Sequence, residues 1–220
     1  MDLKALVRDL YGVDRPQGCT DEEIAAMKEK FGEIPAAVED FWRTFGRTPR
    51  LSYVQDDWMF PAFYEKWGWP KKLEDLSLLC ENQYVYEAAV LQKDLSLPDP
   101  PVYIRPAADE GPWQLSAPTV SEFLEAALLY EAVWQLDHEP GEFYWLTDTE
   151  LAVVQAKLTK SPAVLKNWFV SETTFYSNRP DNLVVIMDME DGTYQAMYGG
   201  ATRESYTALM EVMEGLGEPI

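Results

Sequence analysis

Residues 79–104 read LCENQYVYEAAVLQKDLSLPDPPVYI, and they contain two strand-like runs separated by turn-forming residues. The first run, residues 84–91, follows the polar residues Glu81, Asn82 and Gln83. The second run, residues 102–105, follows an acidic, proline-rich turn at residues 99–101. Polar residues and prolines at the ends of such runs are typical of turns. The pattern therefore predicts two strands with a polar corner before the first of them.

The elements on the N-terminal side of these strands are predicted to be helical. Thr20 and Glu23 have the spacing of a capping box, and Gly32 ends the helix that they begin. Pro35 suits the first position of a second helix. Its buried face is expected to carry Val38, Phe41, Trp42 and Phe45. A short amphipathic helix is expected at residues 2–10, whereas residues 58–67 fit either a strand or a short helix.

The elements that follow complete an α+β pattern. We expect further strands at residues 76–80 and 114–117, then a helix capped by Thr119 or Ser121 that runs to about Gln135 and turns Trp134 inward. A helix is predicted at residues 147–158, a strand at 168–176, and a helix from Thr202 that Gly217 ends. Asp191-Gly192 predicts a hairpin of residues 183–189 and 193–198, which Gly199 and Gly200 end.

The predicted fold is a mixed or mostly antiparallel β-sheet faced by helices, with a C-terminal helix–hairpin–helix extension. With 220 residues and 47% apolar residues, the chain can bury a sizeable core. We expect a single domain over residues 1–220, with a core at about 20–136 and an extension at about 140–216. The apolar hairpin strands are expected to join or flank the main sheet.

The net charge of −20 excludes several partners. Nucleic acid and anionic membrane surfaces attract clustered lysines and arginines, so neither is expected to bind. Residues 106–156 contain no Lys or Arg and ten acids: Asp109, Glu110, Glu122, Glu125, Glu131, Asp137, Glu139, Glu142, Asp148 and Glu150. This acidity either serves solubility or attracts a basic protein. Two cysteines make no disulfide framework, and the first residues do not form a signal peptide, so a cytoplasmic protein is expected.

Catalytic signatures are absent from the sequence. His138 is its one histidine, which rules out a zinc site built on two histidines, and no phosphate-binding glycine loop occurs. Cys80 lies among apolar residues and is expected to be buried, and the turn at residues 188–192 lacks the spacing of a calcium loop. The sequence therefore predicts a protein that is not an enzyme and that has no cofactor and no metal site.

Residues 79–104, in their order of motifs, resemble the core of the SUKH superfamily, also called the Smi1/Knr4 family. Many members carry an ENQG corner before one strand and DPPVY at the start of the next. Ile34 and Pro35 stand at the positions of the family's LP motif, and VSEFLEAALLYEAV is similar to the helix that closes the family's core. The resemblance covers about residues 20–136. Gly46 and Arg47 stand where the family often has Asn-Gly.

The resemblance implies a non-enzymatic bacterial immunity protein. Such a protein would bind a cognate polymorphic toxin domain, often a nuclease, and neutralise it by occlusion. The alternative, which the fungal members suggest, is a regulatory or scaffold protein that binds host proteins. The oligomeric state is left open.

Two interpretations of the polar corner also stay open, since it is either a turn that satisfies backbone groups or a recognition surface. In the same way, Trp58, Trp67 and Trp69 are either core residues or exposed interface residues. The candidate residues for binding a partner are Asp56, Asp57, Trp58, Glu81, Asn82, Gln83, Tyr84, Tyr86, Asp109 and Glu110.

Overall fold

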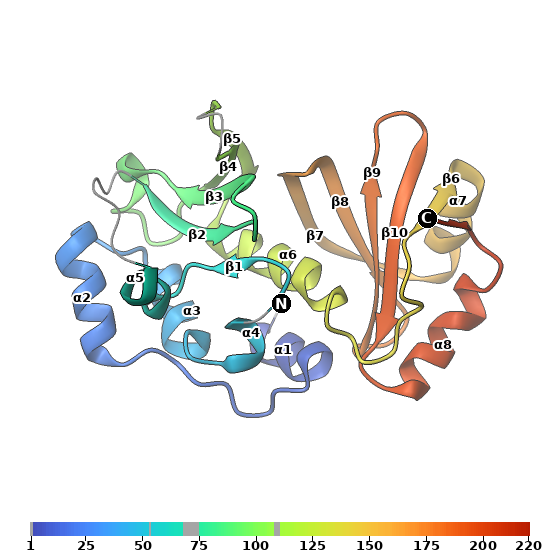
Figure 1. Cartoon of the computed structure of the whole chain (residues 1–220), viewed down its shortest axis with the longest axis horizontal. Coiled ribbons are helices and arrows are strands. Elements are labelled where there is room, and N and C mark those ends of the chain that lie inside the picture. The colour runs from blue at the N-terminus through green and yellow to red at the C-terminus, as the bar shows by residue number, and fades with distance from the viewer. Residues whose placement is uncertain (1, 53, 68–74, 108–110) are drawn as a thin grey trace. The chain divides into compact units, whose positions relative to one another are not determined.

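The computed structural model describes residues 2–52, 54–67, 75–107 and 111–220. The chain divides into two compact units. The central unit is Arg15–Leu124, and the terminal unit combines Met1–Asp14 with Glu125–Ile220. Each unit contains one antiparallel sheet together with helices, so the fold is α+β (Figure 1).

The sheet of the central unit has the strand order β1-β2-β3-β4-β5. Its strands are β1 (Asp57–Trp58), β2 (Leu76–Cys80), β3 (Tyr86–Val90), β4 (Val102–Pro106) and β5 (Gln114–Ala117). Each strand pairs antiparallel with the next, and a 3-10 turn at Gln92–Asp94 lies between β3 and β4. Sequence neighbours are therefore sheet neighbours, as in a meander.

Short helices complete the central unit. They are α2 (Asp21–Phe31), α3 (Ala36–Phe45), α4 (Pro49–Ser52), α5 (Pro61–Trp67) and the first residues of α6 (Val120–Val133). The predicted capping box of Thr20 and Glu23 is present, and Thr119 caps α6 through the amide of Glu122. The ring of Phe41 lies 5.2 Å from that of Trp58 and 5.7 Å from that of Phe60. These aromatic contacts form the core between α3 and the residues around β1.

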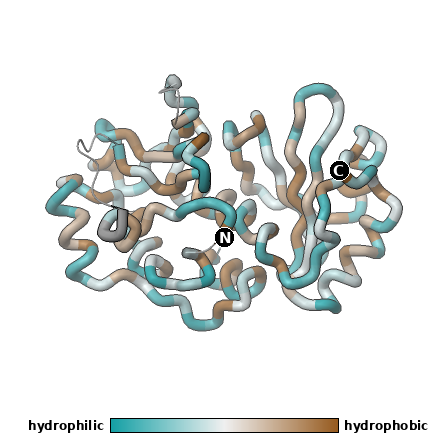
Figure 2. Tube along the Cα trace, in the orientation of Figure 1, coloured by the Kyte–Doolittle hydropathy of each residue, from teal (hydrophilic) through white to brown (hydrophobic). Residues whose placement is uncertain are grey.

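The sheet of the terminal unit has the order β11-β6-β10-β9-β8-β7. Its strands are β6 (Tyr144–Thr147), β7 (Thr159–Trp168), β8 (Val170–Ser177), β9 (Asn182–Asp188), β10 (Thr193–Gly200) and β11 (Glu218–Pro219). All described pairs are antiparallel. In Figure 2 the turn between β9 and β10 is hydrophilic, whereas both strands carry hydrophobic stretches, which fits a hairpin that is half-buried next to its turn and buried further from it.

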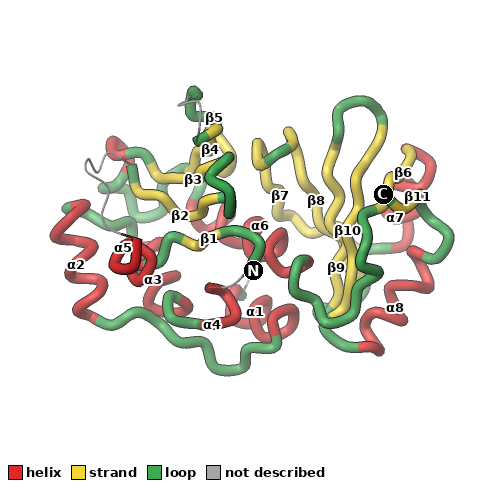
Figure 3. The backbone as a smooth tube through the Cα atoms, viewed as in Figure 1, coloured by secondary structure: helices red, strands yellow, loops and turns green. Residues whose placement is uncertain are grey.

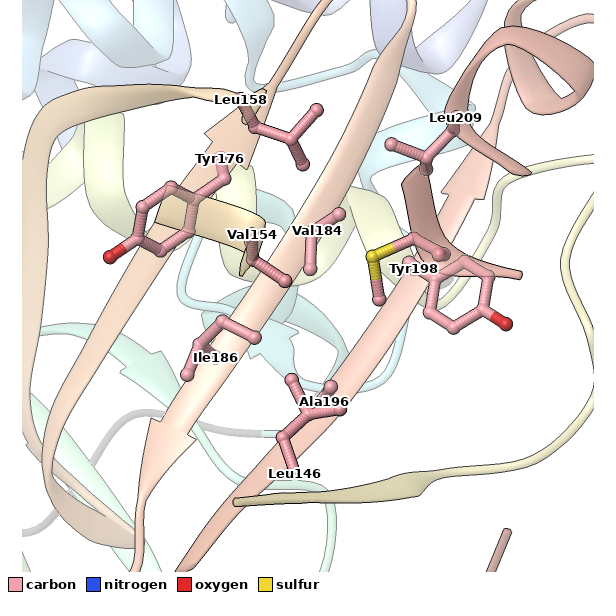
Figure 4. Close-up of a cluster of buried hydrophobic side chains, with 10 residues drawn as sticks. Leu146, Val154, Leu158, Tyr176, Val184, Ile186, Ala196, Tyr198 and Leu209 are labelled. Carbon is pink, nitrogen blue, oxygen red and sulfur yellow. The ribbon is translucent and has the colours of Figure 1, made fainter. Parts of the chain in front are cut away.

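The helices of the terminal unit are α1 (Leu3–Tyr11), the part of α6 from Glu125 on, α7 (Asp148–Lys157) and α8 (Arg203–Met213). The buried hydroxyl of Tyr11 donates to the carbonyl of Leu128 at 2.5 Å, which joins α1 to α6. A long loop leads from α6 to β6 (Figure 3). Side chains from α7, α8 and the sheet point toward one another in one apolar cluster (Figure 4), formed by Leu146, Val154, Leu158, Tyr176, Val184, Ile186, Ala196, Tyr198, Leu209 and Met213.

The structure corrects four expectations. The hairpin of β9 and β10 does not join the first sheet, because it forms the middle of a second one. Gly199 and Gly200 do not end the hairpin but belong to β10, where a Cβ at Gly200 would lie 2.5 Å from the amide nitrogen of Tyr206. The last helix ends at Met213, before Gly217. Trp134 does not turn inward, since its side chain is 37% exposed.

Strands β6 and β7 were not expected from the sequence.

Among the described residues, none of the helices has both the length and the apolar character that crossing a membrane requires.

Candidate functional site

The polar corner between β2 and β3 is organised by the side chain of Glu81. This carboxylate is only 5% exposed and accepts hydrogen bonds from the backbone amides of Gln83 at 2.8 Å and Val85 at 3.1 Å. The amide of Glu81 donates to the carbonyl of Tyr86 at 3.0 Å, and the amide of Tyr84 donates to the carbonyl of Glu81 at 2.7 Å. Glu81 thus holds the turn by satisfying backbone donors, which is the structural role considered for it.

Tyr84 has a backbone conformation that is unusual for its residue type. Its φ is 59°, in the left-handed region, and its side chain is 49% exposed. A left-handed conformation costs an L-residue with a Cβ about 1–2 kcal/mol. Partial burial, together with the negative charge of Asp57, raises the pKa of the Tyr84 hydroxyl above its ordinary value. The corner therefore presents a tyrosine ring beside a carboxylate.

Three of the expected partner-binding residues are buried. Asp56 and Trp58 lie inside the central unit with Glu81, and Trp58 packs on the aromatic core. These side chains have almost no surface to offer a partner. Asp57, Asn82, Gln83, Tyr84 and Tyr86 keep exposed or half-exposed side chains.

The structure brings these five residues to one end of the sheet. Asp57 lies opposite Cys80 in the β1–β2 pair, and Tyr86 lies opposite Pro106 in the β3–β4 pair. The side-chain amide of Asn82 donates to the carbonyl of Gln55 at 2.7 Å, which joins the corner to the segment before β1. Val85, which the sequence did not single out, adds an exposed apolar side chain next to Tyr84. We call Asp57, Asn82, Gln83, Tyr84, Val85 and Tyr86 the corner surface.

Some expected residues fall outside the part of the chain that the structure describes. Asp109 and Glu110 belong to this group, and so does Trp69. The backbone of Trp67 belongs to α5, and its side chain is not described.

A second polar group lies across β2, β3 and β4 and was missed by sequence reasoning. The guanidinium of Arg105 pairs with the carboxylate of Glu87 at 3.2 Å and stacks over the ring of Trp113, 4.3 Å from its centroid. The hydroxyl of Ser77 also donates to Glu87. Arg105 and Glu87 face each other across the β3–β4 pair, so the strand register is the signal that would have revealed them. Their charges compensate each other within the sheet.

Cys80 and His138, which the sequence analysis considered as reactive residues, have different surroundings. Burial, and next the charge of Glu87, raises the pKa of the Cys80 thiol well above its ordinary value, so the reactive thiolate is disfavoured. His138 is half-buried and forms a bridge with Gly200 through backbone hydrogen bonds. In the described ranges, no three His, Cys, Asp or Glu side chains gather as metal ligands. The corner surface is suited to binding through an aromatic ring and carboxylates.

The acids of residues 106–156 have different surroundings. Glu131 is fully buried, and its charge contributes to raising the pKa of Tyr11, after burial itself. Glu150 caps α7 together with Thr147. Among the acids of this stretch that the structure describes, those with exposed side chains are Glu122, Asp137, Glu139, Glu142 and Asp148. Only part of this acidic stretch can therefore act on a partner from the surface.

No protein-family model matches this chain, and no curated protein or solved structure was found to be similar to it.

Proposed function

We propose that this chain is a protein-binding inhibitor of the immunity-protein kind, which binds the C-terminal domain of a polymorphic toxin and neutralises it by occlusion. The corner surface makes the contact, with Tyr84 at its centre. The observation that carries the proposal is the exposed side chain of Tyr84 on a left-handed backbone.

The backbone conformation of Tyr84 favours a binding role over a structural one. Glycine adopts a left-handed φ without strain, and many members of the family that residues 79–104 resemble have glycine at this position of the corner. Tyrosine introduces strain here, and half of its side chain remains in contact with solvent. Strain of this size concentrates at functional sites, and tyrosine is among the residues that contribute most to protein interfaces.

The charge supports a basic partner. A net charge of −20 raises the rate of encounter with a positively charged protein, and it opposes encounter with nucleic acid. Nucleases present basic surfaces to their substrates, so a nuclease domain is the toxin class that suits this inhibitor best. Asp57 places a carboxylate beside Tyr84, where a lysine or arginine of the partner can reach it.

Two experiments test the proposal. Expression of the chain together with the C-terminal toxin domain encoded beside its gene is expected to restore growth that the toxin domain alone abolishes. Calorimetric titration of the purified pair is expected to give nanomolar affinity that weakens as salt is raised. Absence of both protection and binding would overturn the proposal, and capture of several host proteins in its place would favour the regulatory or scaffold alternative.

A further inference from the structure

The terminal unit contains a pocket that combines aromatic rings with carboxylates. Its volume is about 220 Å³, and it lies between the end of α6, the loop that follows it and β10. Trp134 directly after α6, Phe143 from the loop and Tyr198 from β10 supply the rings. Glu139 and Glu142, both from the loop, supply the carboxylates. None of these residues belongs to the corner surface.

The rings of the pocket are held in place by aromatic contacts with each other and with Tyr144. Trp134 and Phe143 meet edge to face, with centroids 5.6 Å apart, and Tyr198 packs on Tyr144 at 5.4 Å. Trp134 nevertheless keeps 37% of its surface exposed. An exposed indole directly after a helix, packed against Phe143 and Tyr130, provides a π-face to a ligand at little cost in conformational entropy.

The two carboxylates differ in what they already bind. Glu139 accepts a hydrogen bond from the amide of Gly141, which closes the loop. Glu142 is exposed and makes no hydrogen bond or ion pair with the described part of the chain. No lysine or arginine is among the described residues that line the pocket, and the sequence has none between residues 106 and 156. The negative charge of the pocket is therefore not neutralised from within.

We propose that this pocket binds an organic cation, namely the guanidinium or ammonium group of an arginine or lysine side chain on a basic protein. Aromatic faces attract such cations through their quadrupole, and the carboxylates add direct charge attraction. An anion would be repelled, and a neutral apolar group would gain nothing from Glu139 and Glu142. The choice of a protein side chain as the source rests on the proposed function, whereas the preference for a cation rests on the pocket alone.

The probe for the pocket is butylguanidinium, and its neutral counterpart of the same shape is butylurea. Binding is followed by the indole N–H signal of Trp134 in ¹H–¹⁵N spectra of the full chain. This signal is assigned as the one that is missing from the spectrum of Trp134→Phe. We expect butylguanidinium to bind about tenfold more tightly than butylurea and to lose that advantage in Glu142→Gln. Equal shifts with both probes, or no shift of this signal, would overturn the proposal.

Matched variants separate the pocket from the rest of the unit. Trp134→Leu is expected to abolish binding of butylguanidinium, whereas Trp145→Leu, which removes another exposed tryptophan on β6, leaves the affinity unchanged. Glu211→Gln, on the exposed side of α8, is the matched control for Glu142→Gln and is expected to leave the affinity for butylguanidinium unchanged. A loss of binding in Trp145→Leu or Glu211→Gln would contradict the assignment to this pocket.

A last comparison, between binding of butylguanidinium and binding of the toxin domain, separates the pocket from the proposed function. If butylguanidinium binds and the toxin domain does not, the proposal that the pocket binds a cation is supported and the proposed function is refuted. If the toxin domain binds with equal affinity to the wild type and to Glu142→Gln, and butylguanidinium does not bind, the pocket fails and the proposed function stands.

Discussion

Replacing Glu81 by alanine is expected to destabilise the central unit more than any other single change at the corner. The carboxylate is 5% exposed and accepts two backbone hydrogen bonds, from Gln83 at 2.8 Å and Val85 at 3.1 Å. Hydrogen bonds to a charged group contribute about 1.5–3 kcal/mol each, which sets an upper limit of about 3–6 kcal/mol. The side chains of Gln83 and Val85 are exposed, so water can reach the released amides. We therefore expect a loss of about 2–3 kcal/mol.

The assay is thermal and denaturant unfolding of the full chain, followed by tryptophan fluorescence. Trp42 and Trp58 are buried in the central unit, so their signal reports its unfolding. For a chain of this length, 1 kcal/mol corresponds to a shift in Tm of about 2–4 °C, so Glu81→Ala should lower Tm by about 4–12 °C. Glu81→Gln keeps an acceptor without the charge and should lose about 1 kcal/mol.

Asn82→Ala is the matched control for Glu81→Ala. It removes one hydrogen bond, 2.7 Å long, from an exposed side chain, so its cost should stay near 0.5 kcal/mol. Equal stabilities of Glu81→Ala and Asn82→Ala would refute the reasoning that the buried carboxylate holds the turn.

Three further predictions concern single residues. Cys80 in the folded protein should react with a thiol reagent at about pH 8 far more slowly than in denaturant, because burial raises its pKa; equal rates would contradict this. Glu150 has a lowered pKa because it accepts backbone hydrogen bonds. Its contribution to stability is present above its unfolded pKa of about 4.5 and is lost as pH falls through the lower folded pKa. Glu150→Gln should therefore cost about 1 kcal/mol at about pH 7 in denaturant unfolding, and progressively less as the pH falls below about 4.5. Gly200→Ala should cost about 2 kcal/mol or more in the same assay, since its Cβ would lie 2.5 Å from the amide of Tyr206, and a neutral effect would show that β10 can shift.

Local signals in the sequence predicted the elements that depend on near neighbours. The capping box of Thr20 and Glu23 begins α2 as expected, and Asp191-Gly192 lies in the turn of the β9–β10 hairpin. In both cases the stabilising contacts lie within a few residues of each other, so the sequence contains the whole motif.

The second sheet depends on contacts between distant residues, which the pattern of single segments does not contain. Strand β6 pairs with β10, about fifty residues further along the chain, as in the pairing of Leu146 with Tyr194. Strand β7 contains Pro162, which argues against a central strand. Pro162 is tolerated because β7 is the edge strand of the sheet, and because the register of the β7–β8 pair shifts between Lys160 and Val164.

The sequence named residues of the corner as candidates but did not predict their geometry. The sequence singled out the corner, yet Asp56, Trp58 and Glu81 proved to be buried. The left-handed backbone of Tyr84 was not predicted, because tyrosine favours extended strands, and the glycine that the resembled family often has at this position was its one signal in the sequence. The pocket at Trp134 was missed because helical spacing predicted that this residue would be buried.

We propose that Tyr84 contacts a protein partner from its strained backbone conformation. The most direct test is the affinity of the toxin domain for the wild type, Tyr84→Gly and Glu190→Gly, measured by calorimetry. Glu190 also has a positive φ, of 63°, in the exposed β9–β10 turn, so its replacement changes the backbone in the same way away from the corner. We predict that Tyr84→Gly remains folded and binds at least about tenfold more weakly, while Glu190→Gly binds as the wild type does. Equal affinity of the wild type and Tyr84→Gly would contradict the account.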